Sequence, residues 1–342
     1  MRVWLSICLG ILLVFTMFGI GALAAPFTPG NLVLTDATND RVIEVNISGD
    51  EPEIVQIITW PLGDTSRRRP LGMAFDPNGT LYVGITGVPT SATEQVQFPT
   101  GRAEVLRIKA DGTQSFHALP GDEIDKITLV SSFNPDEVFV MRNTPLPYPC
   151  YMFRVRFSGD EISDITKFTM SSEDENGQVS SHGEALIMPD GRILIPRHNV
   201  SVINVYGPDG GDPIDAIPTE RGYVSLAYQE GTDYFLALVN GQKSVDVITL
   251  DGEAFDLLDF GSLDGIVESW NVNFLGDGSD KFMLAEKTES DPQSQNAVFI
   301  YDASDLAGWP IRYLLPLDEP SSLFDFHFVP EPPAPVDDWP LH

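Results

Sequence analysis

Short runs of apolar and β-branched residues alternate with turns along most of the chain. The runs are rich in Val, Ile, Leu, Phe and Tyr, and they are separated by Asp-Gly, Asn-Gly, Gly-Asp and Pro-containing turns. Apolar runs bounded by such turns are typical of β-strands, and no amphipathic helical pattern of useful length follows the first 24 residues. The pattern predicts an all-β chain.

The clearest unit begins at Pro70 and reads PLGMAFDPNGTLYVGI, followed after a long loop by EVLRIKADGTQSFHAL. It predicts strands at 72–75, 81–85, 104–108 and 115–119, with tight turns at 76–79 and 111–112. Four antiparallel strands joined by tight turns make one blade of a β-propeller.

Similar units follow, and their first strands recur about every 40 to 55 residues, as in blades. The predicted strands of these four units are 127–131, 137–141, 151–157 and 167–170; 185–188, 192–195, 202–206 and 215–217; 224–228, 234–239, 244–249 and 254–259; and 270–275, 281–285, 297–301 and 311–314. Three strands precede the full units, at 31–35, 42–45 and 54–59, and one follows them, at 323–329. The prediction is a six-bladed β-propeller with four antiparallel strands per blade, in which the C-terminal strand joins the N-terminal three and closes the ring.

The first residues predict export. Arg2 is followed by an apolar stretch from Val3 to Leu23 that ends in Ala-Leu-Ala, which is the pattern of a secretory signal peptide cut after Ala24. The alternative is an uncleaved membrane anchor. The predicted organisation is therefore a signal peptide at 1–24, a propeller at 25–330 and a proline-rich tail at 331–342, in a secreted, extracellular or periplasmic protein.

Charge and cysteine content narrow the partners. The chain has 50 acidic and 20 basic residues and a net charge of −30, which disfavours nucleic acid and anionic membrane surfaces as partners. Cys8 leaves with the signal peptide, so Cys150 stands alone and no intrachain disulfide forms. We expect a monomer whose partner is a small molecule or an extracellular protein.

The unit at 70–85 resembles an NHL-type repeat and, equally, a blade of the senescence-marker-protein/gluconolactonase family of TolB-like six-bladed propellers. The stretch HGEALIMPDGRILIP (182–196) resembles a second blade, and the other units do so in outline. The resemblance implies the propeller fold more than an activity.

That family holds a divalent cation on the propeller axis through a Glu, two Asn and an Asp, so the resemblance also implies where ligands are expected. The Asp is expected in a Pro-Asp-Gly-Met stretch, and here Leu71 stands in its place. An Asn is expected before Gly, and here His182 precedes Gly183; the family's Glu-Gly-Pro opening is missing. These departures speak against the family's lactonase chemistry.

Propeller geometry selects candidate residues, because first strands start and second strands end on one face of the ring, where ligands usually enter. The ligand-binding candidates on that face are Arg69, Arg142, Asn143, Arg197, His198 and Glu286. The Asp76–Gly79 and Asp190-Gly191 turns belong to the opposite face and are typical of tight turns rather than calcium loops.

Imidazoles and carboxylates that converge on one axis are able to perform acid–base chemistry or to hold a metal. The candidate catalytic residues are His182, Glu184 and Glu268, and together with Asn271 they are candidate ligands of a divalent cation such as Ca²⁺, Zn²⁺ or Mn²⁺. The alternative is that these side chains are hydrogen-bonded polar residues that line a wet tunnel.

Arg67, Arg68 and Arg69 form the most concentrated basic run, in the loop expected to lead into a first strand. The guanidinium groups would bind an acidic ligand, or else they form a solvated run paired with nearby acids. No motif specifies a reaction. The predicted function is therefore a secreted propeller that binds a small ligand or a protein partner at the central face, and the alternative is a metal-dependent hydrolase of the gluconolactonase-like class.

Overall fold

The computed structural model describes residues 27–49, 51–60, 66–89, 103–120, 126–132, 134–143, 150–170, 183–197, 200–229, 231–239, 244–250, 252–259, 268–275, 279–287, 297–304, 311–317, 321 and 323–330. The predicted signal peptide and the predicted tail lie outside these residues. Within the described ranges no helix combines the length and apolar character needed to cross a bilayer.

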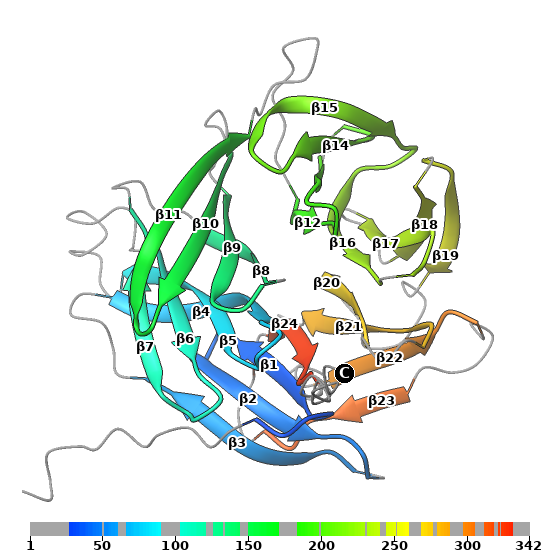
Figure 1. Cartoon of the computed structure of the whole chain (residues 1–342). Coiled ribbons are helices and arrows are strands. Elements are labelled where there is room, and N and C mark those ends of the chain that lie inside the picture. Colours follow the sequence, from blue (N-terminus) through cyan, green and yellow to red (C-terminus); the bar gives the residue numbers. More distant parts are fainter. Residues whose placement is uncertain are drawn as a thin grey trace, which may run out of the picture.

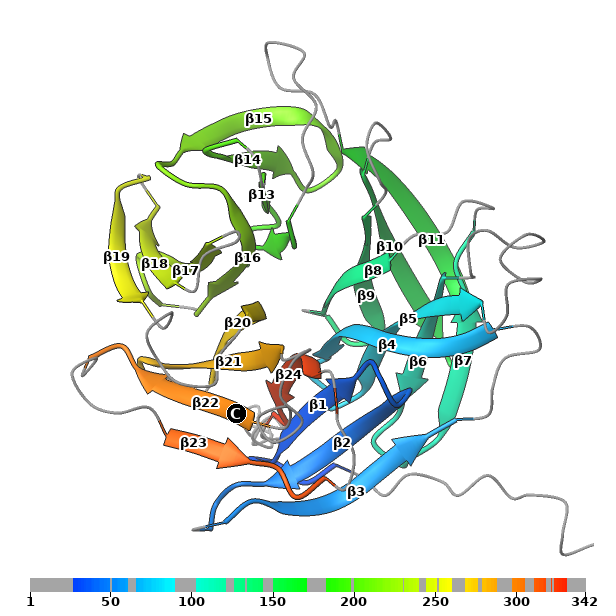
Figure 2. The same cartoon turned by 180° about the vertical axis from the view of Figure 1, so that it is seen from behind.

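The described elements are β-strands, arranged in sheets around a common centre (Figures 1 and 2). The first sheet has the order β24 (Leu323–Phe328), β1 (Leu32–Asp36), β2 (Arg41–Asn46), β3 (Glu53–Thr59), and we call it the closing unit. The second has the order β4 (Ser66–Phe75), β5 (Leu81–Pro89), β6 (Ala103–Ile108), β7 (Gln114–Ala118). Two more four-stranded sheets are β16 (Tyr223–Tyr228), β17 (Tyr234–Val239), β18 (Ser244–Thr249), β19 (Ala254–Asp259), and β20 (Glu268–Phe274), β21 (Lys281–Lys287), β22 (Ala297–Asp302), β23 (Ile311–Leu314).

An eight-stranded sheet consists of two runs of four strands joined at one parallel bridge, Met170 to Gly211. One run is β8 (Lys126–Ser131), β9 (Glu137–Asn143), β10 (Cys150–Ser158), β11 (Glu161–Met170), and the other is β12 (Leu186–Ile187), β13 (Ile193–Pro196), β14 (Val202–Gly207), β15 (Gly210–Pro218). Gly210 has φ of +70°, and a Cβ there would lie 2.9 Å from the Phe168 side chain, so only glycine lets the two runs approach this closely. We refer to each run, and to each four-stranded sheet, as a unit.

The predicted pairing of the last strand with the first three is observed. β24 is antiparallel to β1, with Leu32 opposite Phe328 and Leu34 opposite Phe326. Val33 and His327 also face each other in this ladder. The chain therefore returns to its own beginning, and the link between Thr35 and Asp325 joins residues 290 positions apart.

Burial decreases from the centre outward. In β1 all five residues are buried, whereas the outer strand β3 has an alternating pattern in which Glu53 and Val55 are exposed and Ile54 is partly buried. A strand packed on both faces reads as a continuous apolar run, and an outer strand reads as an alternation. In Figure 1 the strands nearest the centre are β4, β8, β12, β16, β20 and β24.

Apolar clusters lie between units. Tyr82 and Val105 of the β4–β7 unit pack with Val138 and Phe153 of the β8–β11 unit. Each of five further clusters likewise combines two units. One of them joins the β20–β23 unit to the closing unit, because Met283 and Val298 pack with Leu32 and Leu34. Stability of the arrangement therefore rests on contacts between sheets as well as on the ladders within them.

The structure corrects the expected start of the second unit. β4 begins at Ser66 rather than at residue 72, so the three arginines belong to a strand and not to a loop. Arg68 lies opposite Gly87 and Arg69 opposite Thr86 in the ladder with β5, and a register shift between Pro70 and Met73 separates this upper part from the rest. In the sequence, the apolar run of the predicted strand begins only after Pro70, and proline is rare inside strands. The arginines that precede Pro70 are therefore predicted to lie in a loop.

The turn after β4 has the predicted turn structure. Asp76 Oδ1 accepts hydrogen bonds from the amides of Asn78 and Thr80, both at 2.9 Å, and the Gly79 amide donates to the Asp76 carbonyl at 2.9 Å. At the second predicted turn the Arg192 amide donates to Asp190 Oδ1 at 3.0 Å. Both aspartates hold backbone amides within their turns.

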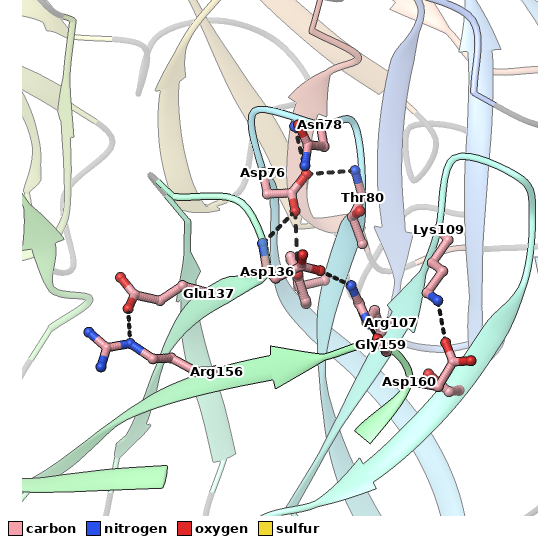
Figure 3. Close-up of polar contacts among 12 residues, drawn as sticks. Asp76, Asn78, Thr80, Arg107, Lys109, Asp136, Glu137, Arg156, Gly159 and Asp160 are labelled. Carbon is pink, nitrogen blue, oxygen red and sulfur yellow. Dashed lines mark hydrogen bonds and ion pairs between the residues drawn. The ribbon is translucent and has the colours of Figure 1, made fainter. Parts of the chain in front are cut away.

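The same turn links two units through polar contacts (Figure 3). Asp76 Oδ2 accepts the Asp136 amide at 3.2 Å, and Arg107 of β6 donates to the Gly159 carbonyl at 2.5 Å and pairs with Asp136. The Arg107 guanidinium also lies 4.7 Å from the centroid of the Phe157 ring, and the residue is only 3% exposed. This cluster is a polar connection between two units.

Candidate functional site

A row of buried polar side chains crosses the centre-facing strands. Glu184 lies just before β12, Ser225 on β16, Asn271 on β20 and Asp325 on β24, so each comes from a different unit. Glu184 is hydrogen-bonded to Ser225, Ser225 Oγ is 2.8 Å from Asn271 Oδ1, and Asn271 Nδ2 is 2.6 Å from Asp325 Oδ1. We call these four residues the central row.

Asp325 receives donors from both sides. Its Oδ2 accepts the Met73 amide of β4 at 2.7 Å, and its Oδ1 accepts the Phe326 amide at 2.8 Å and Asn273 Nδ2 at 3.3 Å, in addition to Asn271. A carboxyl group surrounded by N–H donors is an ionised acceptor. Asp325 is therefore the negative end of the central row.

The closing strand is held to its neighbours at the same level. Thr35 Oγ1 donates to the Leu71 carbonyl at 2.8 Å and accepts the Asp325 amide at 3.0 Å. A buried backbone carbonyl needs such a donor, and here a hydroxyl supplies it across two units. The central row is thus anchored to β1 and β4 as well as to β24.

The hydrogen bonds of the central row run in one direction. Asn271 turns its amide nitrogen to the Asp325 carboxylate, so its oxygen faces Ser225, and the Ser225 hydroxyl donates to it. Glu184 hydrogen-bonds the same Ser225 side chain and lies at the other end of the row from Asp325.

The surroundings of Glu184 shift its pKa. Burial raises the pKa of Glu184 well above its usual range, and the negative charge of Asp325 raises it further. Glu184 is 8% exposed, so a small part of it reaches the surface. The site combines an acid with a raised pKa at one end and the hydrogen-bonded carboxyl group of Asp325 at the other.

The backbone on either side of Gly183 positions the acid. The Gly183 amide donates to the Pro196 carbonyl at 2.7 Å and the Glu184 amide donates to the Val224 carbonyl at 2.8 Å. A Cβ on Gly183 would lie 2.7 Å from the Val224 oxygen and 2.8 Å from the Pro196 ring, so the segment fits between two units only without a side chain.

The structure brings together only part of the predicted site. Glu184 and Asn271 lie in the central row; Glu268 begins β20, but its side chain lies outside the described residues, and His182 lies wholly outside them. Arg69 is a partly buried residue of β4, and Arg197 is fully buried after β13. Arg142 and Asn143 end β9 and Glu286 lies on β21, with side chains that are not among the described residues, and His198 is outside them altogether.

Three members of the site were not predicted. Ser225, Asn273 and Asp325 lie inside apolar runs, and Asp325 belongs to the strand that was recognised only as the closing one. A polar residue at an inward position of a first strand is the signal that could have identified them, because burial there is costly without a partner.

The family resemblance implies a divalent cation, which would need several side-chain ligands close together. Among the described residues no group of three His, Cys, Asp or Glu side chains lies close enough to share an ion. Both oxygens of Asp325 already accept N–H donors. The described side chains, as they are arranged, therefore do not form a site for this ion.

Comparisons with known proteins identify the architecture. No protein-family model matches the sequence, and no curated protein matches it. Among solved structures, a chain of a nidogen/laminin complex is 11% identical with a TM-score of 0.57, and the match covers 87% of this chain and 98% of that one. The chain is a β-propeller.

Two further solved structures are similar to this chain, one of unknown function and one of an enzyme. One is a functionally unknown protein from Desulfotomaculum acetoxidans, 11% identical with a TM-score of 0.53, covering 89% of this chain and 88% of that one. The other is virginiamycin B lyase from Staphylococcus aureus, 11% identical with a TM-score of 0.52, covering 85% and 83%. At such identities the likeness shows the fold alone.

Proposed function

We propose that the chain is an exported β-propeller that binds a small polar ligand at its centre, beside Glu184 and Asn271. The observation that carries the proposal is the central row itself. Apolar clusters already hold the units together, and burying polar groups has a cost, so a row of four polar side chains at the centre is not needed for packing. The neutral acid of Glu184 and the amide of Asn271 supply both donors and acceptors to a ligand.

The same proposal includes six blades in a closed ring. It is supported by the six apolar clusters, each of which combines two units, and by the pairing of β24 with β1. Closure would leave the centre-facing strands around one axis and remove the free inner edge of an open array.

Export is supported by the composition of residues 1–24. N-terminal sequencing of protein recovered from the medium or periplasm is expected to begin at Ala25. Recovery only with membranes and with an intact N-terminus would favour the anchor instead.

The ligand is sought by thermal unfolding of the purified protein with monosaccharides, nucleosides and small carboxylic acids. A ligand at a hundred times its Kd stabilises a protein by about 2.7 kcal/mol, which raises Tm by several °C. We expect one class to act in this way, and Asn271→Leu to abolish the shift. Asn204→Leu is the matched control, because Asn204 is equally buried and bonds Tyr206 outside the central row. A shift that survives in Asn271→Leu, or no shift from any class, would contradict the proposal.

A metal-dependent hydrolase remains the second proposal, since Glu184 and Asn271 are linked through Ser225. It depends on His182 and Glu268, whose side chains are not among the described residues. Unfolding with EDTA and after return of Ca²⁺, Zn²⁺ or Mn²⁺ tests it. A metal-dependent rise in Tm is expected only if this second function holds.

Two of the similar solved structures illustrate why the fold does not choose between functions. One propeller was solved within a nidogen/laminin complex, and another is a lyase. A protein partner at the central face is therefore compatible with the scaffold, while the polarity of the central row favours a small molecule.

A further inference from the structure

His117 lies at the contact between the β4–β7 and β8–β11 units. Its ring, on the outer strand β7, makes a T-shaped contact with Phe157 of β10, with centroids 4.9 Å apart and planes at 70°. Phe157 also stacks on Tyr82 at 5.6 Å, and the guanidinium of Arg107, which pairs with Asp136, lies 4.7 Å from its centroid. An imidazole is therefore part of an aromatic contact between units that already contains one permanent cation.

A hydrogen bond within β7 holds the imidazole in this position. Ser115 Oγ lies 2.8 Å from Nε2 of His117. A hydroxyl group both donates and accepts, so this hydrogen bond is compatible with a neutral and with a protonated ring. The groups around the ring therefore decide which of the two states is favoured.

Within the described part of the chain, the charges that act on His117 come from β6 and from the turn between β10 and β11. Arg107 on β6 disfavours a positive imidazole, whereas Asp160 and Glu161 at the turn favour it. Lys109, directly after β6, is paired with Asp160. Part of the nearby acidic charge is thus already balanced by a lysine, while Arg107 lies close to the aromatic ring that His117 contacts.

These surroundings favour the neutral ring. Burial is the main reason that the pKa of His117 is lower than usual, and the charge of Arg107 lowers it further. A histidine with a lowered pKa in the folded state is still neutral there when an opened chain already binds a proton. The contact is therefore fully stable above the usual histidine pKa of about 6.5, and it weakens as the pH falls from there toward the folded-state value.

We propose that His117 makes the joint between these two units sensitive to acid: when the imidazole takes up a proton, a second cation stands beside Arg107 and the contact between β7 and β10 loosens. The inference is independent of the ligand proposed above. The opening is expected at the outer strands of the two units, because the contact between His117 and Phe157 lies there.

The test is amide hydrogen exchange of the full protein near pH 7.5 and near pH 5, on either side of the usual histidine pKa, read by mass spectrometry and corrected for the intrinsic rate at each pH. We expect exchange in residues 114–118 and 150–158 to accelerate by about threefold or more at the lower pH, relative to residues 244–249 of β18. His117→Phe keeps an aromatic ring against Phe157 but does not titrate, so this relative acceleration is expected to disappear. His327→Gln is the matched control, because it removes another partly exposed imidazole, on β24, and should behave as the wild type does.

Three outcomes would overturn the inference. The first is an equal relative acceleration in the wild type and in His117→Phe. The second is an acceleration that affects β18 as strongly as β7 and β10, since that is a general effect of acid. The third is the absence of any acceleration in the wild type. If His117→Phe does not fold, His117→Gln decides, because its amide can still bond Ser115 and does not titrate.

Discussion

Two carboxyl groups with opposite roles define the site at the scale of single residues. Asp325 is an acceptor for amides from three strands, whereas Glu184 has a pKa that burial raises well above its usual range. The difference comes from their surroundings and not from their chemistry: one carboxyl is surrounded by N–H groups and the other by apolar burial and a neighbouring negative charge.

The raised pKa of Glu184 predicts a specific pH dependence of stability. Its pKa is raised in the folded protein, so the folded state keeps a proton that the unfolded chain loses above about pH 4.3. The stabilisation is complete below that pH and is lost as pH rises toward the folded-state value, by about 1.4 kcal/mol per pH unit. Glu184→Gln removes this loss. Its Tm should equal the wild-type Tm near pH 4 and exceed it by a growing margin as the pH rises toward the folded-state pKa of Glu184. A difference in Tm that does not change with pH would show that Glu184 is ionised in the fold.

A second stability prediction concerns Asp325. Asp325→Asn places an NH₂ group against either the Met73 amide or the Asn271 amide, which are 2.7 and 2.6 Å from the present oxygens. We expect urea unfolding at pH 7 to show a loss of about 2–3 kcal/mol, the range for hydrogen bonds to a charged group. Asp212→Asn, on the exposed side of β15, is the control and should change stability by less than ~0.5 kcal/mol. Equal effects of the two variants would remove Asp325 from its central role.

At the scale of elements, the join between units decides stability. Arg107 leaves β6 to contact Gly159, Asp136 and Phe157, all of the next unit (Figure 3). Arg192 and Asp190 form a similar pair inside one turn, where both side chains are about half exposed. Burial is the main difference between these two pairs.

That difference can be measured. Arg107→Met should lower the free energy of unfolding by about 2 kcal/mol, because it leaves the Gly159 carbonyl without its donor and removes the stacking on Phe157. Arg192→Met should cost less than ~0.5 kcal/mol, as is usual for an exposed pair. Comparable losses for both would mean that the Arg107 contacts do not couple the units.

At the scale of the whole molecule, β24 is the element through which the first and last units meet. It pairs with β1, and Asp325 on it contacts both β4 and β20. Without it, β1 would present a free ladder edge and the central row would lose its negative end.

Removal of residues 322–342 is therefore expected to abolish cooperative thermal unfolding and to promote self-association, as seen by circular dichroism and size-exclusion chromatography. Removal of residues 331–342 keeps β24 and should leave a cooperative transition at nearly the same Tm. A cooperative, monomeric product of the longer deletion would contradict the role assigned to β24.

The local features of this protein are determined by its sequence. Apolar runs and turn residues predicted nearly all strands, the turn chemistry of Asp76 and Asp190, and the pairing of a lone last strand with three first ones, because each depends on neighbours within a few residues or on simple complementarity. The six-blade count remains part of the proposal.

Only the tertiary structure decided which polar residues meet. Met73 and Asp325 are 252 positions apart, and Ser225 joins Glu184 to Asn271 across two sheet boundaries. The placement of Arg67, Arg68 and Arg69 in a strand depends on where β4 begins and on its register with β5. Register, side-chain direction and the approach of neighbouring sheets are set by packing of the whole chain, so no local pattern carries them.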